Sequence, residues 1–151
     1  MGIAAPPLPA TAQLDARRQF DFWLGEWDLE WGSGERGTTS VYLDLDDNVV
    51  VASLDARPSR DYQGIGHAVF VDGCWKQTWV DSDGNYLDFA GFYEDGVMDL
   101  RREAPFEDGF ALYRVRWFDI ERNALRWAYE RSGDGGTTWE PLWEIGYRRV
   151  L

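Results

Sequence analysis

The chain has 151 residues, which is enough for one domain with a sizeable buried core. Its 27 acidic residues against 15 Lys and Arg give a formal net charge of −12. A surface of this sign repels nucleic-acid phosphates and anionic lipid headgroups, so we expect neither nucleic acid nor a membrane as a partner. It agrees with a cationic or neutral ligand, although a long-range field decides little by itself.

A single cysteine, Cys74, excludes an internal disulfide and makes a reducing cytoplasm the expected compartment. No stretch approaches the roughly 20 apolar residues of a membrane-spanning helix. Residues 1–12 are rich in Ala and Pro and lack the basic start and long apolar run of a signal peptide. We therefore expect a disordered leader over 1–12 and one domain over 13–151.

The first predicted element is a helix over residues 13–23. Leu14, Phe20 and Trp23 lie close to helical spacing, and Gly25 can end the helix. From there apolar and polar residues alternate, which is typical of half-buried strands. We predict ten strands, over residues 27–31, 37–43, 49–55, 63–71, 74–80, 86–92, 97–102, 110–118, 124–131 and 138–149.

The connectors between these strands are short and carry residues typical of tight turns, such as Asp72-Gly73 and Glu94-Asp95-Gly96. About ten short strands joined in this way bend into a barrel, because an open sheet of that size does not stay flat. We predict an all-β domain: a single antiparallel up-and-down barrel of about ten strands, preceded by a short N-terminal helix.

A resemblance supports the same fold. Gly25-Glu26-Trp27 matches the Gly-x-Trp that opens the first strand of lipocalins. The longer run Phe20-Asp21-Phe22-Trp23-Leu24-Gly25-Glu26-Trp27 resembles the start of a bacterial lipocalin-like family of uncharacterised proteins, and similar features continue through residues 75–81 to the last strand. The resemblance implies a calycin barrel in which Arg148 or Arg149 lies across the Trp27 indole. It implies no activity.

Residues 132–139, Ser-Gly-Asp-Gly-Gly-Thr-Thr-Trp, match the Asp-box hairpin pattern. The carboxylate of Asp134 can accept N–H groups of the turn while Trp139 packs beneath it. Sialidase-like propellers repeat this box in several blades, whereas this chain has one copy. We interpret it as a structural hairpin.

Motifs for catalysis or cofactor binding are missing. One His and one Cys nearly exclude a zinc site, and no Gly-x-Ser-x-Gly elbow or phosphate-binding loop is present. Haem-binding relatives of this fold carry their ligand His late in the chain, whereas His67 lies in the middle. We expect no metal and no cofactor.

The inward face of the barrel is then the candidate site. Alternation places Trp75, Gln77 and Trp79 on one face of their strand, which we take as inward. His67 lies on the strand before, and its direction depends on the turn between the two strands. It joins the inward set if that turn has three residues (71–73) and points away if it has two (72–73). We favour the three-residue turn by a narrow margin.

The later strands add further aromatic residues. The inward set on strand eight is Tyr113, Val115 and Trp117, which leaves Arg114 and Arg116 outside. The reverse arrangement would place two guanidinium groups in the cavity, as fatty-acid-binding barrels do, and remains the less favoured alternative.

Binding of a small, largely apolar, aromatic ligand inside the barrel is the first functional hypothesis. The expected contacts are aromatic or can hydrogen-bond: Trp75, Gln77, Trp79, Tyr86, Tyr113, Trp117, Trp127, Tyr129 and Trp143. An isomerase or cyclase of secondary metabolism would use His67 or Asp88 as the general acid or base. The third hypothesis is a filled barrel that binds a protein partner. The sequence leaves a homo-oligomer open.

Overall fold

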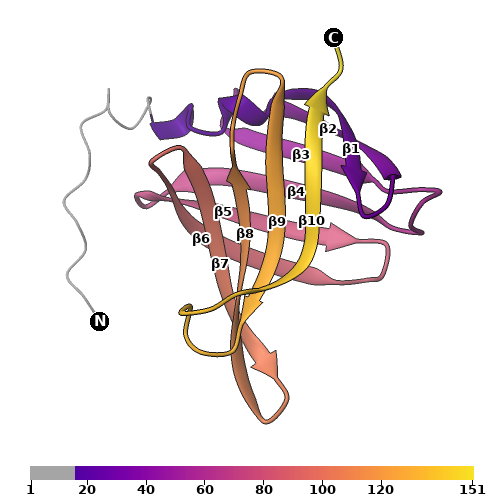
Figure 1. Ribbon diagram of the computed structural model, residues 1–151. Helices are drawn as coiled ribbons and strands as arrows, with labels where there is room; N and C mark the ends of the chain where they lie inside the picture. Colours follow the sequence, from indigo (N-terminus) through magenta and orange to yellow (C-terminus); the bar gives the residue numbers. More distant parts are fainter. Residues whose placement is uncertain (1–15) are drawn as a thin grey trace.

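The computed structural model describes residues 16–151 and shows a closed antiparallel barrel of ten strands (Figure 1). The strands are β1 (Gly25–Trp31), β2 (Glu35–Asp44), β3 (Val49–Asp55), β4 (Gln63–Val71), β5 (Cys74–Asp81), β6 (Tyr86–Glu94), β7 (Val97–Phe106), β8 (Gly109–Phe118), β9 (Ala124–Ser132) and β10 (Glu140–Arg149). Each strand pairs with its neighbours in sequence, and β1 pairs with β10 to close the sheet. The prediction of an up-and-down barrel of about ten strands is confirmed.

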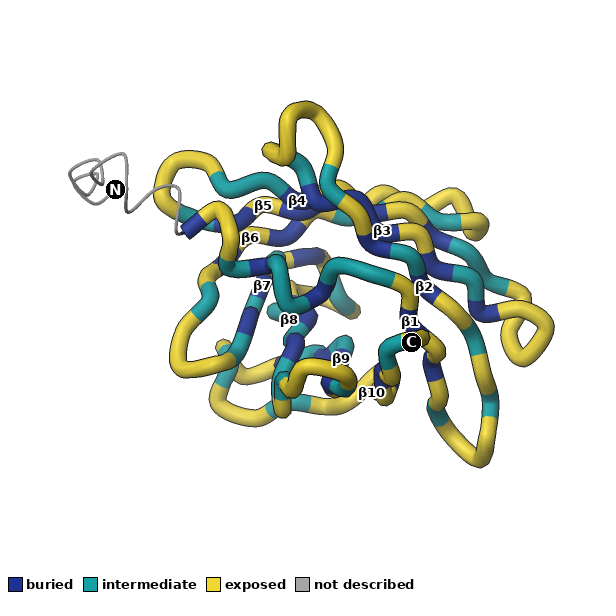
Figure 2. The backbone as a smooth tube through the Cα atoms, turned by 90° about the horizontal axis from the view of Figure 1, so that it is seen from above, coloured by how far each residue is buried: buried dark blue, intermediate teal, exposed yellow. Residues whose placement is uncertain are grey.

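The alternation along the strands explains why the barrel forms. In β1, Trp27 and Leu29 are buried whereas Glu26, Asp28 and Glu30 are exposed. Similar alternation of buried and exposed positions recurs around the barrel (Figure 2). Each strand therefore gives one apolar face to a shared interior, and closure removes the exposed edges that an open sheet would carry.

The predicted helix over residues 13–23 is wrong in its described part, where the helical element is a short 3-10 turn, η1 (Asp21–Trp23). Backbone bonds from Gln19 to Ala16 and from Trp23 to Phe20 span three residues rather than four. Tight turns of this kind place Phe20 and Trp23 on one side, where both are buried against the barrel. Residues 13–15 and the expected leader over 1–12 lie outside the described residues.

The segment with η1 closes one end of the barrel. The Phe20 ring lies 4.9 Å from Trp75 and 5.0 Å from Trp117, both edge-on, and Phe20 has no exposed surface. The Arg149 guanidinium lies 4.2 Å from the ring centre of Trp27 and donates to the carbonyl oxygens of Phe22 and Leu24. These contacts attach the last strand to the segment before the first.

The Asp-box residues form a hairpin between β9 and β10, as predicted. The Asp134 carboxylate accepts the Thr138 N–H at 2.9 Å and the Ser132 hydroxyl at 2.7 Å. The Trp139 indole donates to the carbonyl of Gly136, and the Arg114 guanidinium lies 3.8 Å from its ring centre. All of these groups lie on the outer side of the barrel, so the motif is structural.

Candidate functional site

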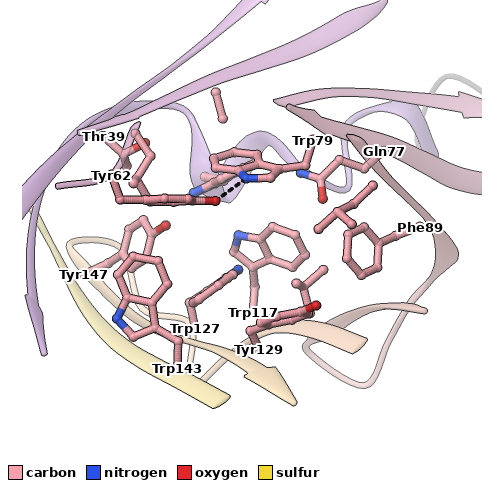
Figure 3. A pocket seen from close by; sticks show the side chains of 15 residues that line it. Thr39, Tyr62, Gln77, Trp79, Phe89, Trp117, Trp127, Tyr129, Trp143 and Tyr147 are labelled. Atoms are coloured by element: carbon pink, nitrogen blue, oxygen red, sulfur yellow. Dashed lines mark hydrogen bonds between the residues drawn. The ribbon is translucent and has the colours of Figure 1, made fainter. Parts of the chain in front are cut away.

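A cavity of about 80 Å³ lies inside the barrel, beyond the η1 segment (Figure 3). Most of its lining is apolar or aromatic: Trp23, Thr39, Ala52, Leu54, Tyr62, Gln77, Trp79, Leu87, Phe89, Val115, Trp117, Trp127, Tyr129, Trp143 and Tyr147. Trp23, Trp117 and Tyr147 are buried next to the closed end and form its floor. Half-buried residues such as Trp79 and Trp143 form the mouth at the other end.

The floor presents a hydrogen-bond donor that no group of residues 16–151 accepts. The indole nitrogen of Trp117 is buried and has no hydrogen-bond partner among the described residues. Figure 3 shows the Trp117 nitrogen directed toward the middle of the cavity. Buried indole N–H groups usually find an acceptor, so this donor marks a place where a ligand or water oxygen fits.

Polar groups also lie halfway up the wall. Gln77 is 5% exposed, and its side-chain amide lines the cavity beside Trp79 (Figure 3). Thr39 lies across from it, but its hydroxyl already donates to the Ser53 carbonyl at 2.8 Å. Gln77 is therefore the side chain at this level that can both donate to and accept from a ligand.

The mouth is organised by a chain of hydrogen bonds. The Trp79 indole donates to the Tyr62 hydroxyl at 2.7 Å, and that hydroxyl donates to the Asp81 carboxylate at 2.9 Å. Burial raises the pKa of Tyr62 well above its ordinary value, and the neighbouring carboxylate adds to the shift. Tyr62 is therefore a neutral hydrogen-bonded group at ordinary pH and holds the Trp79 ring in place.

The structure brings six of the nine expected ligand contacts to the cavity wall: Gln77, Trp79, Trp117, Trp127, Tyr129 and Trp143. Trp75 points inward but packs under the η1 segment, where its indole donates to Gln19 at 3.0 Å. Tyr113 stacks on Tyr129 with 6.0 Å between ring centres and does not line the cavity. Tyr86 is 65% exposed on the outer surface, contrary to the expected contact.

The expected inward position of His67 is wrong, because the turn between β4 and β5 does not have the three residues that we favoured. Asp72 and Gly73 have φ angles of 55° and 80°, and Val71 pairs directly with Cys74, so the turn has two residues. His67 consequently lies on the outer face, opposite Thr78, and is exposed. Asp88 is also exposed on that face. Neither side chain reaches the cavity, so the acid–base role assigned to them has no structural basis.

Arg114 and Arg116 point outward, as the favoured alternative expected. Their Nε atoms donate to one oxygen of Glu130 at 2.7 and 2.8 Å. Burial tends to raise the pKa of Glu130, but hydrogen bonds from both guanidinium groups outweigh it and the net pKa is lowered. This ionised cluster links β8 to β9 on the outside of the barrel.

Sequence reasoning missed several lining residues because they lie outside its predicted inward sets. Tyr62 comes from the connection before β4, where no alternation indicates a direction. Trp23 belongs to the segment interpreted as a helix, although its place in the Phe-Asp-Phe-Trp run is a usable signal. Leu87 and Phe89 share the inward parity of β6, whereas Tyr86 was named for its hydroxyl although it shares the solvent-facing parity of Asp88.

Across residues 16–151, no three His, Cys, Asp or Glu side chains converge as a metal site requires. None of the helical segments in the described chain has the length and apolar character needed to cross a membrane. Neither a known family model nor any curated protein matches the chain. The closed ten-stranded barrel is consistent with a lipocalin-like fold.

Proposed function

We propose that this protein binds a small, flat aromatic molecule with a hydrogen-bond acceptor inside its barrel, as a member of a lipocalin-like family in the cytoplasm. The observation that carries the proposal is the unpartnered Trp117 N–H in a cavity walled by aromatic rings. Burying a ring against these walls supplies most of the affinity, and an acceptor on the ligand satisfies a donor that otherwise stays unpaired.

The cavity size limits the ligand to about one ring. Its volume of about 80 Å³ is well below the roughly 300–1,000 Å³ of pockets for drug-sized molecules. It is also smaller than the roughly 150 Å³ space that admits benzene in an engineered core. The cavity must therefore widen to hold even one ring, and rotation of Trp127 and Trp143, which are half-buried and meet edge-on at 6.0 Å, would provide the space.

To test this proposal, the purified protein is titrated with benzamide, and binding is detected as a change in tryptophan fluorescence. We expect saturable binding that Trp117→Phe weakens by roughly 5- to 15-fold, the equivalent of about 1–1.5 kcal/mol for one hydrogen bond. Trp139→Phe is the matched control, since Trp139 lies on the outer surface. We expect this variant to bind benzamide like the parent protein.

Because Trp117 is also a core residue, Gln77→Met provides a second variant that keeps the side-chain length and removes the amide. We expect it to weaken benzamide binding by about tenfold or less. Absence of saturable binding would overturn the proposal, as would equal losses in Trp117→Phe and Trp139→Phe. Native mass spectrometry of the freshly purified protein then identifies any molecule that the barrel retains.

A further inference from the structure

The arginines of this acidic protein are mostly paired with carboxylates. Within the described chain, ion pairs within 4.0 Å involve Arg18, Arg36, Arg57, Arg101, Arg114, Arg116, Arg126 and Arg131. Six other arginines form none with any described residue, and two of these, Arg60 and Arg102, lie beside aromatic rings at the mouth end of the cavity. Arg102 differs from the other arginines without an ion pair because it is half-buried on the inward face, where a charge is costly unless it has a partner.

Arg102 points into the barrel from β7. It shares its parity with Met98, Leu100 and Ala104, which are all buried. Its guanidinium lies 5.9 Å from the ring centre of Phe89, a cavity-lining residue, and 5.8 Å from that of Tyr113. The Nε atom is buried and has no hydrogen-bond partner within residues 16–151.

Tyr129, another lining residue, lies close to the same guanidinium. Burial raises the pKa of Tyr129, and the positive charge of Arg102 opposes that shift. The aromatic faces around Arg102 compensate part of the cost of burying its charge, and a hydrogen bond from its guanidinium also lowers the pKa of Tyr129, but its Nε–H has no acceptor among the described residues. An anion at this position would satisfy both the charge and the donors.

Arg60 flanks the mouth on the other side. It belongs to the connection between β3 and β4, and its guanidinium lies 4.3 Å from the ring centre of Trp143 and 5.1 Å from that of Tyr62. Both rings line the cavity. The nearby Asp81 carboxylate is occupied by hydrogen bonds from Tyr62 and Asn85, so the rim retains positive groups that a ligand can use.

We infer that the ligand of this cavity is an aromatic carboxylate, with its ring in the aromatic pocket and its carboxylate held by Arg102 at the mouth. The inference rests on the proposed function and specifies the ligand class of the same site. The planar guanidinium presents a fork of donors that matches the two oxygens of a carboxylate. Arg60 lies on the opposite rim, where it favours entry of an anion.

The net charge of −12 does not oppose this assignment. Exposed charges are screened over about 8 Å at physiological ionic strength, whereas the half-buried Arg102 guanidinium lies 5.9 Å from the ring centre of the lining residue Phe89. The net charge alone agreed with a cationic or neutral ligand. The local charges at the mouth favour an anionic one instead.

The test compares benzoate with benzamide, which has nearly the same shape and no charge, at neutral pH. We expect the parent protein to bind benzoate at least about tenfold more tightly. We expect Arg102→Met to remove that preference and to leave benzamide affinity within about twofold. Arg148→Met is the control, because Arg148 is exposed on β10, and it should keep the preference.

The outcomes separate the two proposals. Equal or tighter binding of benzamide by the parent protein would overturn the carboxylate assignment and leave the proposed binding function standing. A loss of both probes in Arg102→Met would assign Arg102 a structural role only. Binding of neither probe by the parent protein would overturn both proposals. If Arg102→Met fails to fold, Arg102→Lys is the substitute test. It keeps the charge without the fork of donors, so we expect its preference for benzoate over benzamide to lie between those of the parent protein and of a variant without the charge.

Discussion

Two glycines on the inward face of β4 determine how the Trp79 indole lies. Gly64 and Gly66 both face Trp79, and a Cβ on Gly66 would lie 2.9 Å from the Trp79 Cε3 atom. A Cβ on Gly64 would overlap the same ring. Glycine in a strand usually weakens it, but here two of them let a large ring lie flat against the backbone. That position brings the Trp79 N–H to the Tyr62 hydroxyl.

Gly64→Ala should therefore displace Trp79 and break its hydrogen bond to Tyr62. We expect a loss of about 1–3 kcal/mol in the free energy of unfolding, the usual cost of overpacking, measured by urea denaturation. Benzamide binding should weaken as well, because Trp79 lines the cavity. Gly133→Ala is the control, since a Cβ there meets no atom within 4 Å. Unchanged stability in Gly64→Ala would contradict this account of the ring.

At the scale of elements, the short segment before β1 acts as the floor of the barrel. It contributes one tight turn and no strand, yet Phe20 and Trp23 contact aromatic residues of distant strands. Aromatic side chains bury large areas and prefer the edge-on arrangement seen here. The segment thereby separates the cavity from solvent at this end.

Phe20→Ala should leave a large void at this junction. Removal of a fully buried Phe typically costs about 3–5 kcal/mol, and we expect a loss of that size in urea denaturation. Phe110→Ala, at a position 68% exposed, should change stability by roughly 0.5 kcal/mol or less. Similar losses in the two variants would show that the segment does not act as a packed floor.

At the scale of the whole molecule, the carboxylates set the response to acid. Hydrogen bonds from Arg57 lower the pKa of Asp55 to about 2, and hydrogen bonds from Thr138 and Ser132 hold the pKa of Asp134 far below its usual range. Depressed pKa values contribute stability that is present above the unfolded pKa of about 3.9 and lost as pH falls through the folded values. Relief of repulsion among the acidic groups acts in the opposite direction.

We expect the first effect to prevail, so the melting temperature should fall as pH is lowered from about 5 toward 2. Asp134→Asn should lower the melting temperature at neutral pH and flatten its decline in acid, because the variant has no proton to gain at this position. Asp88→Asn, at an exposed position, should keep the steep decline of the parent protein. Differential scanning calorimetry measures both slopes, and parallel slopes would contradict the role of Asp134.

The sequence by itself determined the all-β class, the ten strands and most of the aromatic wall. These features follow from alternation and turn residues, which act over a few neighbouring positions. Gln77, Trp79, Trp127 and Trp143 were placed correctly for this reason, since the parity of their strands is clear. The outward direction of Arg114 and Arg116 follows in the same way from the apolar parity of β8.

Only the tertiary structure decided the features that depend on one residue of register or on closure of the barrel. A two-residue turn sends His67 outward, and a shift of one residue would have reversed it. Closure brings Tyr62, Arg60 and Arg102 around one mouth, although they come from a connection and a strand far apart in sequence. Local patterns carry no information on such meetings, because the closing of the sheet creates them.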